Sequence, residues 1–278
     1  MEKKTIRIPN SEYKQRPHIT YYLGDVHEGA ANQTTAQFKK AVAMIACDGD
    51  AWVGVGDYID AINYHDPRFN PCEISQDYGI RDLSDLPRAQ CDRFIHNIAP
   101  IADKCIGLIS GNHEDAYKRH NTFDCTQYIC DAIKTDNLKH KAWISLTFFR
   151  KGDKEKTCPV KIVVCHGAGG GGMREGYPIN KVYDVFRWDM ADVHVMGHLH
   201  QMATDRATYH QYTNDVLRAD NVWFASNGCF LAKSAFGNDG YFEQKPGKES
   251  AIGLIRQSIY PSTHDKSQTR IILEPVYL

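Results

Sequence analysis

The sequence has 278 residues, of which 42% are hydrophobic, with 33 basic and 34 acidic residues and a formal net charge of -1. This balance lacks the basic excess that is typical of a general nucleic-acid-binding protein. No apolar run approaches the roughly 20 residues of a membrane-spanning helix. The polar stretch 1–10 does not resemble a signal peptide, and the nine cysteines form no Cys-x-x-Cys pair, so we expect a cytoplasmic protein without a membrane partner.

Hydrophobic periodicity predicts that strands and helices alternate along the first part of the chain. Strands are expected at 17–23, 51–55, 105–109, 143–149, 160–165 and 193–196, and helices at 34–47, 86–99 and 122–133. After residue 200 the pattern is mostly strand-like, most clearly at 222–225 and 269–273. This order favours an α/β (α+β) fold with two sheets flanked by helices. We expect a single domain over 1–278, with an excursion within 61–98 near the functional site.

Five short polar clusters follow the expected strands in a fixed order. Each comes directly after a short apolar run, where a buried strand would end. Together they supply carboxylate, amide and imidazole groups, which are ligands for divalent cations. The clusters are Gly24-Asp25-Val26-His27, Gly56-Asp57-Tyr58-Ile59-Asp60, Gly111-Asn112-His113-Glu114, His166-Gly167 and Gly197-His198-Leu199-His200.

These ligand types indicate a site that hydrolyses a phosphate ester with two metal ions. Two cations about 3.5–4 Å apart neutralise the charge of the phosphate oxygens and create a hydroxide nucleophile at neutral pH. Asp57 is the natural bridging carboxylate. Asp25 and His27, two residues apart at a strand end, can point to one cation when the chain turns. His198 and His200 have the same spacing.

The other polar residues of the clusters have complementary roles. Asn112 offers a neutral oxygen and His166 another nitrogen. Adjacent side chains diverge, so His113 is free to reach the leaving-group oxygen and protonate it. Asp60 would orient the His113 imidazole and raise its pKa. The donor mixture favours two Mn²⁺ ions, with Fe²⁺, Zn²⁺, Co²⁺ or Ni²⁺ as alternatives, over Ca²⁺.

The ordered clusters resemble the calcineurin-like metallophosphoesterase superfamily. Its pattern is Asp-x-His, Gly-Asp-x-x-Asp, Gly-Asn-His-Glu or Gly-Asn-His-Asp, His, and Gly-His-x-His, and all five motifs occur here in order. The resemblance implies a four-layer αββα sandwich of two facing mixed sheets flanked by helices. It also implies that His113 is the proton donor, paired with Asp60. The implied ligands are Asp25, His27, Asp57 and His200 for the first metal, and Asp57, Asn112, His166 and His198 for the second.

The chain departs from two branches of this superfamily. In the protein Ser/Thr phosphatase branch an arginine follows the Gly-Asp-x-x-Asp motif and grips the phosphate, whereas Ala61 stands here. The double-strand-break-repair nuclease branch carries a sizeable capping domain after the catalytic core. Here the strand-like pattern after His200 looks needed to finish the sheets. The chain therefore looks like the compact form that is common in bacteria and their phages.

A glycine-rich run follows His166 and is a candidate substrate loop. Gly169 and Gly170 would expose backbone N–H groups and let a bulky anion approach closely. Arg174 and Lys181 would add charge-assisted contacts to a second phosphate or a base. A flexible connector without ligand contact is an equally good interpretation.

A few further residues have two interpretations each. Tyr58 and Tyr64 would stack on a nucleobase near the site, although packing is the commoner role of tyrosine. His65 lies in the excursion and is left unassigned. Glu114 is either a partner of the metal ligands or, as we favour, a carboxylate that complements a helix N-terminus.

These observations favour a metal-dependent phosphodiesterase that hydrolyses a small nucleotide, such as a cyclic nucleotide or a cyclic dinucleotide. The missing phosphatase arginine, the balanced charge and the compact length support this choice. A DNA or RNA nuclease and a phosphomonoesterase are the enzymatic alternatives, so nucleic acid is an alternative substrate. The non-enzymatic alternative is a metal-binding scaffold, which would have no reason to keep His113 and Asp60. For a viral protein, the expected location is the host cytoplasm.

Overall fold

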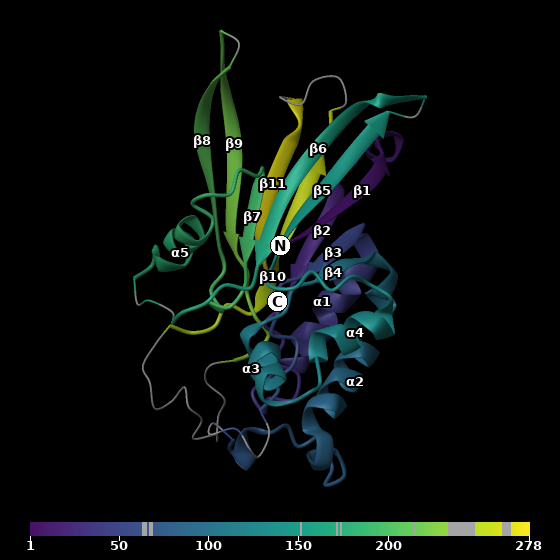
Figure 1. Ribbon diagram of the computed structural model, residues 1–278, viewed down its shortest axis with the longest axis vertical. Helices are drawn as coiled ribbons and strands as arrows, with labels where there is room; N and C mark the ends of the chain where they lie inside the picture. Colours follow the sequence, from purple (N-terminus) through teal and green to yellow (C-terminus); the bar gives the residue numbers. More distant parts are fainter. Residues whose placement is uncertain are drawn as a thin grey trace.

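The chain folds around two mixed β-sheets (Figure 1). The computed structural model describes residues 1–62, 66, 69–150, 152–170, 172, 174–213, 215–232, 248–262 and 268–278. The six-stranded sheet has the order β1-β5-β6-β7-β9-β8, with β1 (Glu2–Pro9), β5 (Lys141–Arg150), β6 (Asp153–Cys165), β7 (Val193–Met196), β8 (Ala203–Thr213) and β9 (Val216–Ser226). The five-stranded sheet has the order β11-β10-β2-β3-β4, with β2 (His18–Leu23), β3 (Ala51–Gly54), β4 (Cys105–Leu108), β10 (Gly253–Tyr260) and β11 (Arg270–Tyr277).

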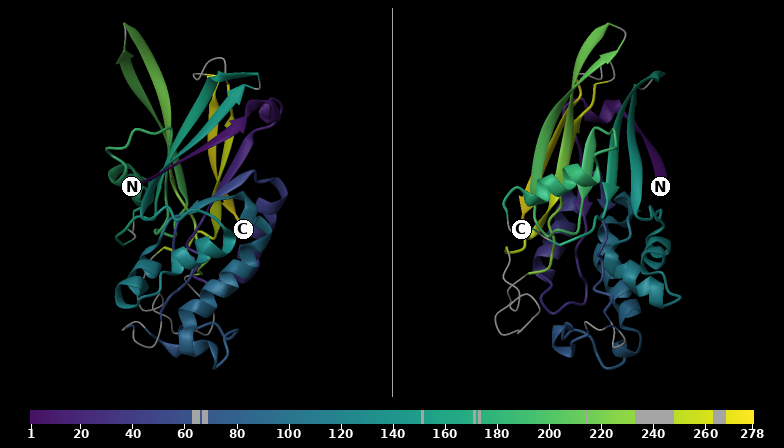
Figure 2. Two further views of the ribbon diagram at one scale, coloured as in Figure 1. Left: turned by 45° about the vertical axis from the view of Figure 1, so that its right-hand side comes forward. Right: turned by 60° about the vertical axis from the view of Figure 1, so that its left-hand side comes forward.

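Helices cover the outer faces of both sheets and complete four layers (Figures 1 and 2). The five-stranded sheet packs against α1 (Thr35–Asp48), α2 (Leu86–Ile98) and α4 (Cys125–Ile133). The six-stranded sheet packs against α5 (Tyr177–Val185), and α3 (Asn112–His120) begins shortly after β4. The predicted sandwich of two mixed sheets flanked by helices is confirmed. None of the helices in the described ranges combines the length and the apolar character needed to cross a membrane.

Strand β2 shows why the central strands could be recognised in the sequence. Tyr22 is fully buried in the core between the sheets, and its neighbour Tyr21 is fully buried on the side of the helices. Successive side chains of a strand point to opposite faces, so a strand with a layer on each side needs an unbroken run of apolar or aromatic residues.

Several elements differ from the sequence-based expectation. The polar stretch 1–10 contains β1, which pairs in parallel with β5 at the edge of its sheet, where only Ile8 of the strand is buried. Helix α5 was not expected, and β8 and β10 were covered only by the general strand-like pattern expected after residue 200. The predicted excursion 61–98 includes α2, but Phe94 and Ile98 of this helix are fully buried in the core. The excursion is therefore confined to the residues before α2.

The strands that carry the motifs end at a common edge of the sandwich. β2, β3 and β4 are parallel neighbours in one sheet, and β6 and β7 are parallel neighbours in the other. Hydrogen bonds join the loops that follow them: Asp25 N donates to Gly56 O at 2.8 Å, and Nδ1 of His166, after β6, donates to Val55 O, after β3 of the other sheet, at 2.8 Å. Residues far apart in sequence thus meet where the strands end.

Candidate metal centre

Five of the predicted ligands have an uncommon backbone conformation. Asp25, His27, Asp57, His198 and His200 all have positive φ, between 49° and 75°. Such left-handed conformations in non-glycine residues cost on the order of 1 kcal/mol or more each and cluster at functional sites. Here they turn the chain sharply after each strand and bring the side chains together.

Glycines let the loops approach one another closely. A Cβ atom on Gly111 would lie 2.1 Å from both the backbone N and Oδ1 of Asp57, so no larger residue fits at this position. Gly56 has a φ of 94°, and a Cβ there would lie 2.6 Å from Nδ1 of His166. The glycines of the motifs therefore serve the packing of the ligand loops.

Asp25, His27 and His200 form the first ligand group. Nε2 of His27 lies 3.2 Å from Nε2 of His200, and Nε2 of His200 lies 3.4 Å from Oδ1 of Asp25. One ligand atom from each of the three residues falls within 4.8 Å of the others. Desolvation lowers the pKa of His27, which favours the neutral imidazole that a metal needs.

Asn112, His166 and His198 form the second ligand group around Asp57. Nδ1 of His166 donates to the backbone carbonyl of Val55, so Nε2 is the nitrogen that carries the lone pair when the ring is neutral. This Nε2 faces Oδ1 of Asn112 at 2.9 Å and Oδ2 of Asp57 at 3.1 Å. Nε2 of His198 lies 2.7 Å from Gly169 O and therefore carries the hydrogen, which leaves Nδ1 of His198 with a lone pair.

Asp57 lies between the two groups. Its Oδ2 is 3.9 Å from Nε2 of His27 on one side and 3.1 Å from Nε2 of His166 on the other. Burial would raise the pKa of Asp57, but His166 and His113 hold it well below the usual range. Burial alone would lower the pKa of His166. The negative charge of Asp57 has the larger effect and raises this pKa to about 10. The carboxylate thus draws positive charge, which a divalent cation would supply in place of a proton.

The donor set fits two divalent cations. Imidazole nitrogens face one another, and in the second group a nitrogen lone pair faces two oxygen acceptors. Such contacts repel unless a proton or a cation lies between the atoms. Metal–nitrogen and metal–oxygen bonds of about 2.0–2.2 Å place neighbouring ligand atoms about 3–3.5 Å apart, which matches the distances found here. All seven predicted ligands are brought together at the two groups.

His113 is placed beside the ligands and contacts Asp60, as expected, but the closer contact is with the backbone oxygen rather than the carboxylate. Nδ1 of His113 lies 2.6 Å from the backbone oxygen of Asp60 and 3.5 Å from its carboxylate. The same carboxylate is 3.6 Å from Nδ1 of His27. Burial lowers the pKa of His113, but Asp57 and Asp60 outweigh it and raise the pKa. Asp60 therefore orients His113 through its carbonyl, and its carboxylate is shared between two imidazoles.

Glu114 organises the loop that carries Asp57, which the sequence analysis did not favour. Its buried carboxylate accepts hydrogen bonds from the backbone N–H groups of Asp57 at 3.1 Å, Tyr58 at 2.6 Å, Ile59 at 3.2 Å and Gly111 at 2.9 Å. Desolvation and the nearby Asp57 raise the pKa of Glu114 to about 7. The carboxylate does more than complement the N-terminus of α3, because it also joins two ligand loops.

Of the residues predicted to contact substrate, one is buried in the core and three of the others are exposed. Tyr58 is fully buried and donates from its hydroxyl to Ile109 O at 2.8 Å, so it cannot stack on a nucleobase and that prediction is wrong. Gly169 and Gly170 are exposed next to the second ligand group, and Arg174 is exposed just before α5. Tyr64 and His65 lie outside the described residues.

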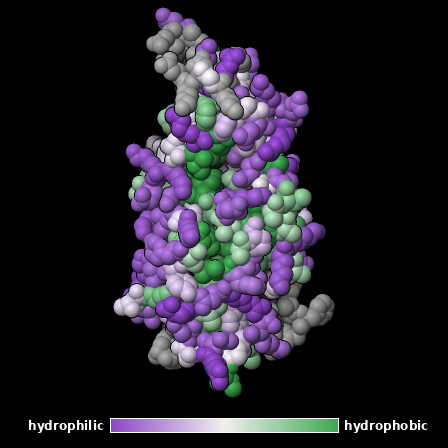
Figure 3. Space-filling model, turned by 90° about the vertical axis from the view of Figure 1, so that its right-hand side faces the viewer, coloured by the Kyte–Doolittle hydropathy of each residue, from purple (hydrophilic) through white to green (hydrophobic). Residues whose placement is uncertain are grey.

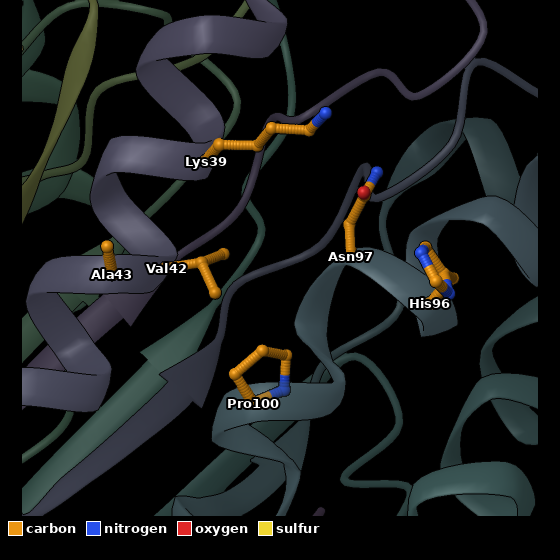
Figure 4. A pocket seen from close by; sticks show the side chains of 6 residues that line it. All are labelled: Lys39, Val42, Ala43, His96, Asn97 and Pro100. Atoms are coloured by element: carbon orange, nitrogen blue, oxygen red, sulfur yellow. The ribbon is translucent and has the colours of Figure 1, made fainter.

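Two pockets lie away from the metal centre. One, of about 420 Å³, is lined by Lys39, Val42, Ala43, His96, Asn97 and Pro100 between α1 and the end of α2 (Figure 4). Another, of about 270 Å³, opens between the sheets and is lined by residues of β1, including Lys4 and Ile6. The side of the molecule seen in Figure 3 carries hydrophobic residues in a strip flanked by hydrophilic ones. Neither pocket contains a predicted ligand or His113.

Comparisons with known proteins find similarity in solved structures alone. No protein-family model matches the chain, and no curated protein matches its sequence. A metallophosphoesterase from Sphaerobacter thermophilus is 11% identical, with 94% of this chain and 89% of that chain covered and a TM-score of 0.40. The phosphoesterase Yfce from E. coli is 12% identical, with 93% and 98% covered and a TM-score of 0.37. Vacuolar Protein Sorting 29 from Cryptosporidium parvum is 13% identical, with 95% and 100% covered and a TM-score of 0.36.

Proposed function

We propose that this protein is a metal-dependent phosphoesterase, and more narrowly a phosphodiesterase for a small nucleotide. The observation that carries the proposal is the pair of ligand groups that share Asp57, with His113 beside them and held at Nδ1 by the carbonyl of Asp60. The ordered motifs resemble those of the calcineurin-like metallophosphoesterases. Mn²⁺ is the metal that we propose, because the donors mix carboxylate, amide and imidazole groups.

The residues divide the work of hydrolysis. Bound divalent cations supply neutralisation of the phosphate charge and a hydroxide at neutral pH. Asp57 belongs to both ligand groups and sets their separation. His113 keeps Nδ1 hydrogen-bonded to the carbonyl of Asp60, which directs its other nitrogen away and leaves it to protonate the leaving oxygen. Glu114 holds the Asp57 loop through backbone hydrogen bonds.

Two observations support a small diester as the substrate. At the place of the phosphatase arginine, Ala61 is buried and its backbone N–H donates to Oε1 of Gln90 at 2.9 Å, so no side chain there can grip a phosphomonoester. The formal net charge of -1 gives no general attraction for a long polyanion. A nuclease or a phosphomonoesterase remains an outcome of the test below.

The decisive experiment is turnover with and without Mn²⁺. We expect the chelator-treated protein to be inactive on bis-p-nitrophenyl phosphate and to recover with added Mn²⁺. A panel of cyclic mononucleotides, cyclic dinucleotides, DNA, RNA and phosphomonoesters then tests the narrower proposal, with selective cleavage of a small nucleotide as the expected result. Turnover by metal-free protein would refute the metal dependence. If protein with both metal sites occupied hydrolysed none of these substrates, the non-enzymatic alternative of a metal-binding scaffold would be favoured.

Replacement of His113 separates catalysis from metal binding. His113→Ala should keep the metal content but lower turnover by roughly 10²–10⁴-fold, because a general acid contributes about that much. The loss should be largest for esters with poor leaving groups, which need a proton most. An unchanged rate on an unactivated ester would remove His113 from the mechanism.

A further inference from the structure

Lys181 of α5 is a cation that has no counter-ion among the described residues, and it lies near the second ligand group. Its side chain is partly buried, and none of the described residues forms a hydrogen bond or an ion pair with its ammonium group. A Cβ atom on Gly169 would lie 3.5 Å from Nζ of Lys181, so the ammonium lies against the glycine-rich loop. The backbone oxygen of Gly169 in turn contacts Nε2 of His198 at 2.7 Å. Lys181 is thus separated from the second ligand group by one residue.

The acidic residues around α5 are engaged elsewhere. Glu175 lies 2.9 Å from Nζ of Lys248, and Asp184 pairs with Arg187 at the same distance. Asp205 accepts a hydrogen bond from the hydroxyl of Tyr183. Since no carboxylate of the described residues pairs with Lys181, its charge is disfavoured near two proposed cations unless an anion lies between them.

The position of Lys181 is defined by packing. Val182 of α5 and Phe186, which follows the helix, are buried in the core between α5 and the six-stranded sheet and hold the helix in place. The hydroxyl of Tyr177 donates to Gly170 O at 2.7 Å, and a Cβ on Gly172 would lie 2.4 Å from the Tyr177 ring. These contacts of Tyr177 hold α5 against the glycine-rich loop. A side chain on a helix is positioned more accurately than one on a mobile loop, so the charge of Lys181 has a defined place.

We propose that Lys181 binds a second phosphate of the substrate, next to the phosphate held at the metal centre. The favoured substrate class is then a nucleotide that carries at least two phosphate groups. This inference rests on the proposed function, since it assumes that a phosphate occupies the metal centre. The ammonium group would contact phosphate oxygens with charge-assisted hydrogen bonds, and the phosphate would be the counter-ion that the described residues do not supply.

The test compares binding of AMP and ADP, which differ by one phosphate. Calorimetric titrations use the full chain with the same saturating Mn²⁺ in cell and syringe. We expect ADP to bind about tenfold more tightly than AMP, because one charge-assisted contact contributes on the order of a tenfold change. Lys181→Met should remove this preference by weakening ADP alone, and Lys181→Arg should keep most of it. Lys161→Met, which removes an exposed lysine of β6, is the matched control and should change neither affinity.

The outcomes separate this inference from the proposed function. Equal affinities of the wild-type protein for AMP and ADP, no binding of either nucleotide, or an equal loss of both in Lys181→Met would overturn the role of Lys181. Metal content of each variant, measured in parallel, identifies a merely structural effect. If the Lys181-dependent preference is found but bis-p-nitrophenyl phosphate is not hydrolysed, the phosphate site stands and the catalytic proposal fails. If bis-p-nitrophenyl phosphate is hydrolysed but ADP is not preferred over AMP, the catalytic proposal stands and the phosphate site at Lys181 fails.

Discussion

The two ligand groups differ in how the chain encloses them. In the first, Asp25 and His27 are buried, and the backbone N–H of His27 donates to Asp57 O at 3.1 Å. In the second, His198 is only partly buried and lies against the exposed Gly169. His166 of the second group is also buried, and His200 of the first is partly exposed, so the difference is one of degree: the first group has two buried ligands of its own, whereas the second has one and borders a surface loop.

This difference indicates how the centre divides structural and substrate-facing roles. Buried ligands on strained backbone are held by the surrounding structure, so changes there should disturb the fold as well as the metal. A ligand at the edge can be altered with less structural cost. We therefore expect a substrate to approach from the side of His198 and the glycine-rich loop, the side on which Lys181 lies.

Asp57→Asn should have the largest effect, because it removes the charge that both groups share. Asparagine keeps the size of the side chain and an acceptor for the backbone N–H of His113, which lies 3.0 Å from Oδ1. We expect metal content to fall from two ions per chain to fewer than one, and turnover to fall by roughly 10³-fold or more, since metal-ion catalysis contributes several kcal/mol. Two ions retained by metal analysis would contradict the bridging role. Asp115→Asn, a partly exposed neighbour of the site that pairs with His140, is the control.

The pair His27→Ala and His198→Ala tests the contrast between the groups directly. Both should lower metal content and activity. Removal of the buried His27 ring, which packs edge-on against His113 and His200, should also destabilise the metal-free protein by about 2 kcal/mol. His198→Ala should cost less than about 1 kcal/mol, because its ring is partly exposed. Urea unfolding of the metal-free variants measures both values, and equal losses would show that the two groups are enclosed alike.

The sequence predicted well which polar side chains would lie together, because each motif follows a strand whose end is buried on both faces. Such strands are short unbroken apolar runs, as in β3 and β7, and parallel strands with a common direction bring their ends together. The ligand types then restrict the chemistry. By contrast, β1 has one buried residue and a polar pattern, so nothing in its sequence distinguishes it from a surface segment.

The finer geometry could not be read from the sequence. Positive φ at Asp25 or His200 leaves no mark on the sequence, because neither residue type is restricted to that conformation. Tyr58 looked available for stacking, but its hydroxyl reaches across to Ile109 in the core. The backbone contact of Asp60 with His113 depends on the path of the chain rather than on side-chain chemistry. The expected place of Glu114 at a helix N-terminus was the only signal for this residue, and it does not reveal a contact with a distant loop.

Glu114→Gln should have the smallest of these effects and should act on both groups together. Oε1 of Glu114 accepts from Tyr58 and Ile59, and Oε2 accepts from Asp57 and Gly111. In glutamine one oxygen becomes an NH₂ group, which would face two N–H donors whichever way it turns. Leaving buried donors unpaired costs about 1–3 kcal/mol, so urea unfolding should show a loss of this size in the metal-free protein.

The same substitution should loosen the Asp57 loop and weaken both metal sites equally. We expect affinity for Mn²⁺ to fall by roughly 10–100-fold, the range that is usual for residues that orient metal ligands. Asp115→Asn on the same helix provides the control, since its carboxylate contacts only the exposed His140 among the described residues. If Glu114→Gln weakened one site and spared the other, Glu114 would belong to a single group, and the difference between the groups would extend to the loop that they share.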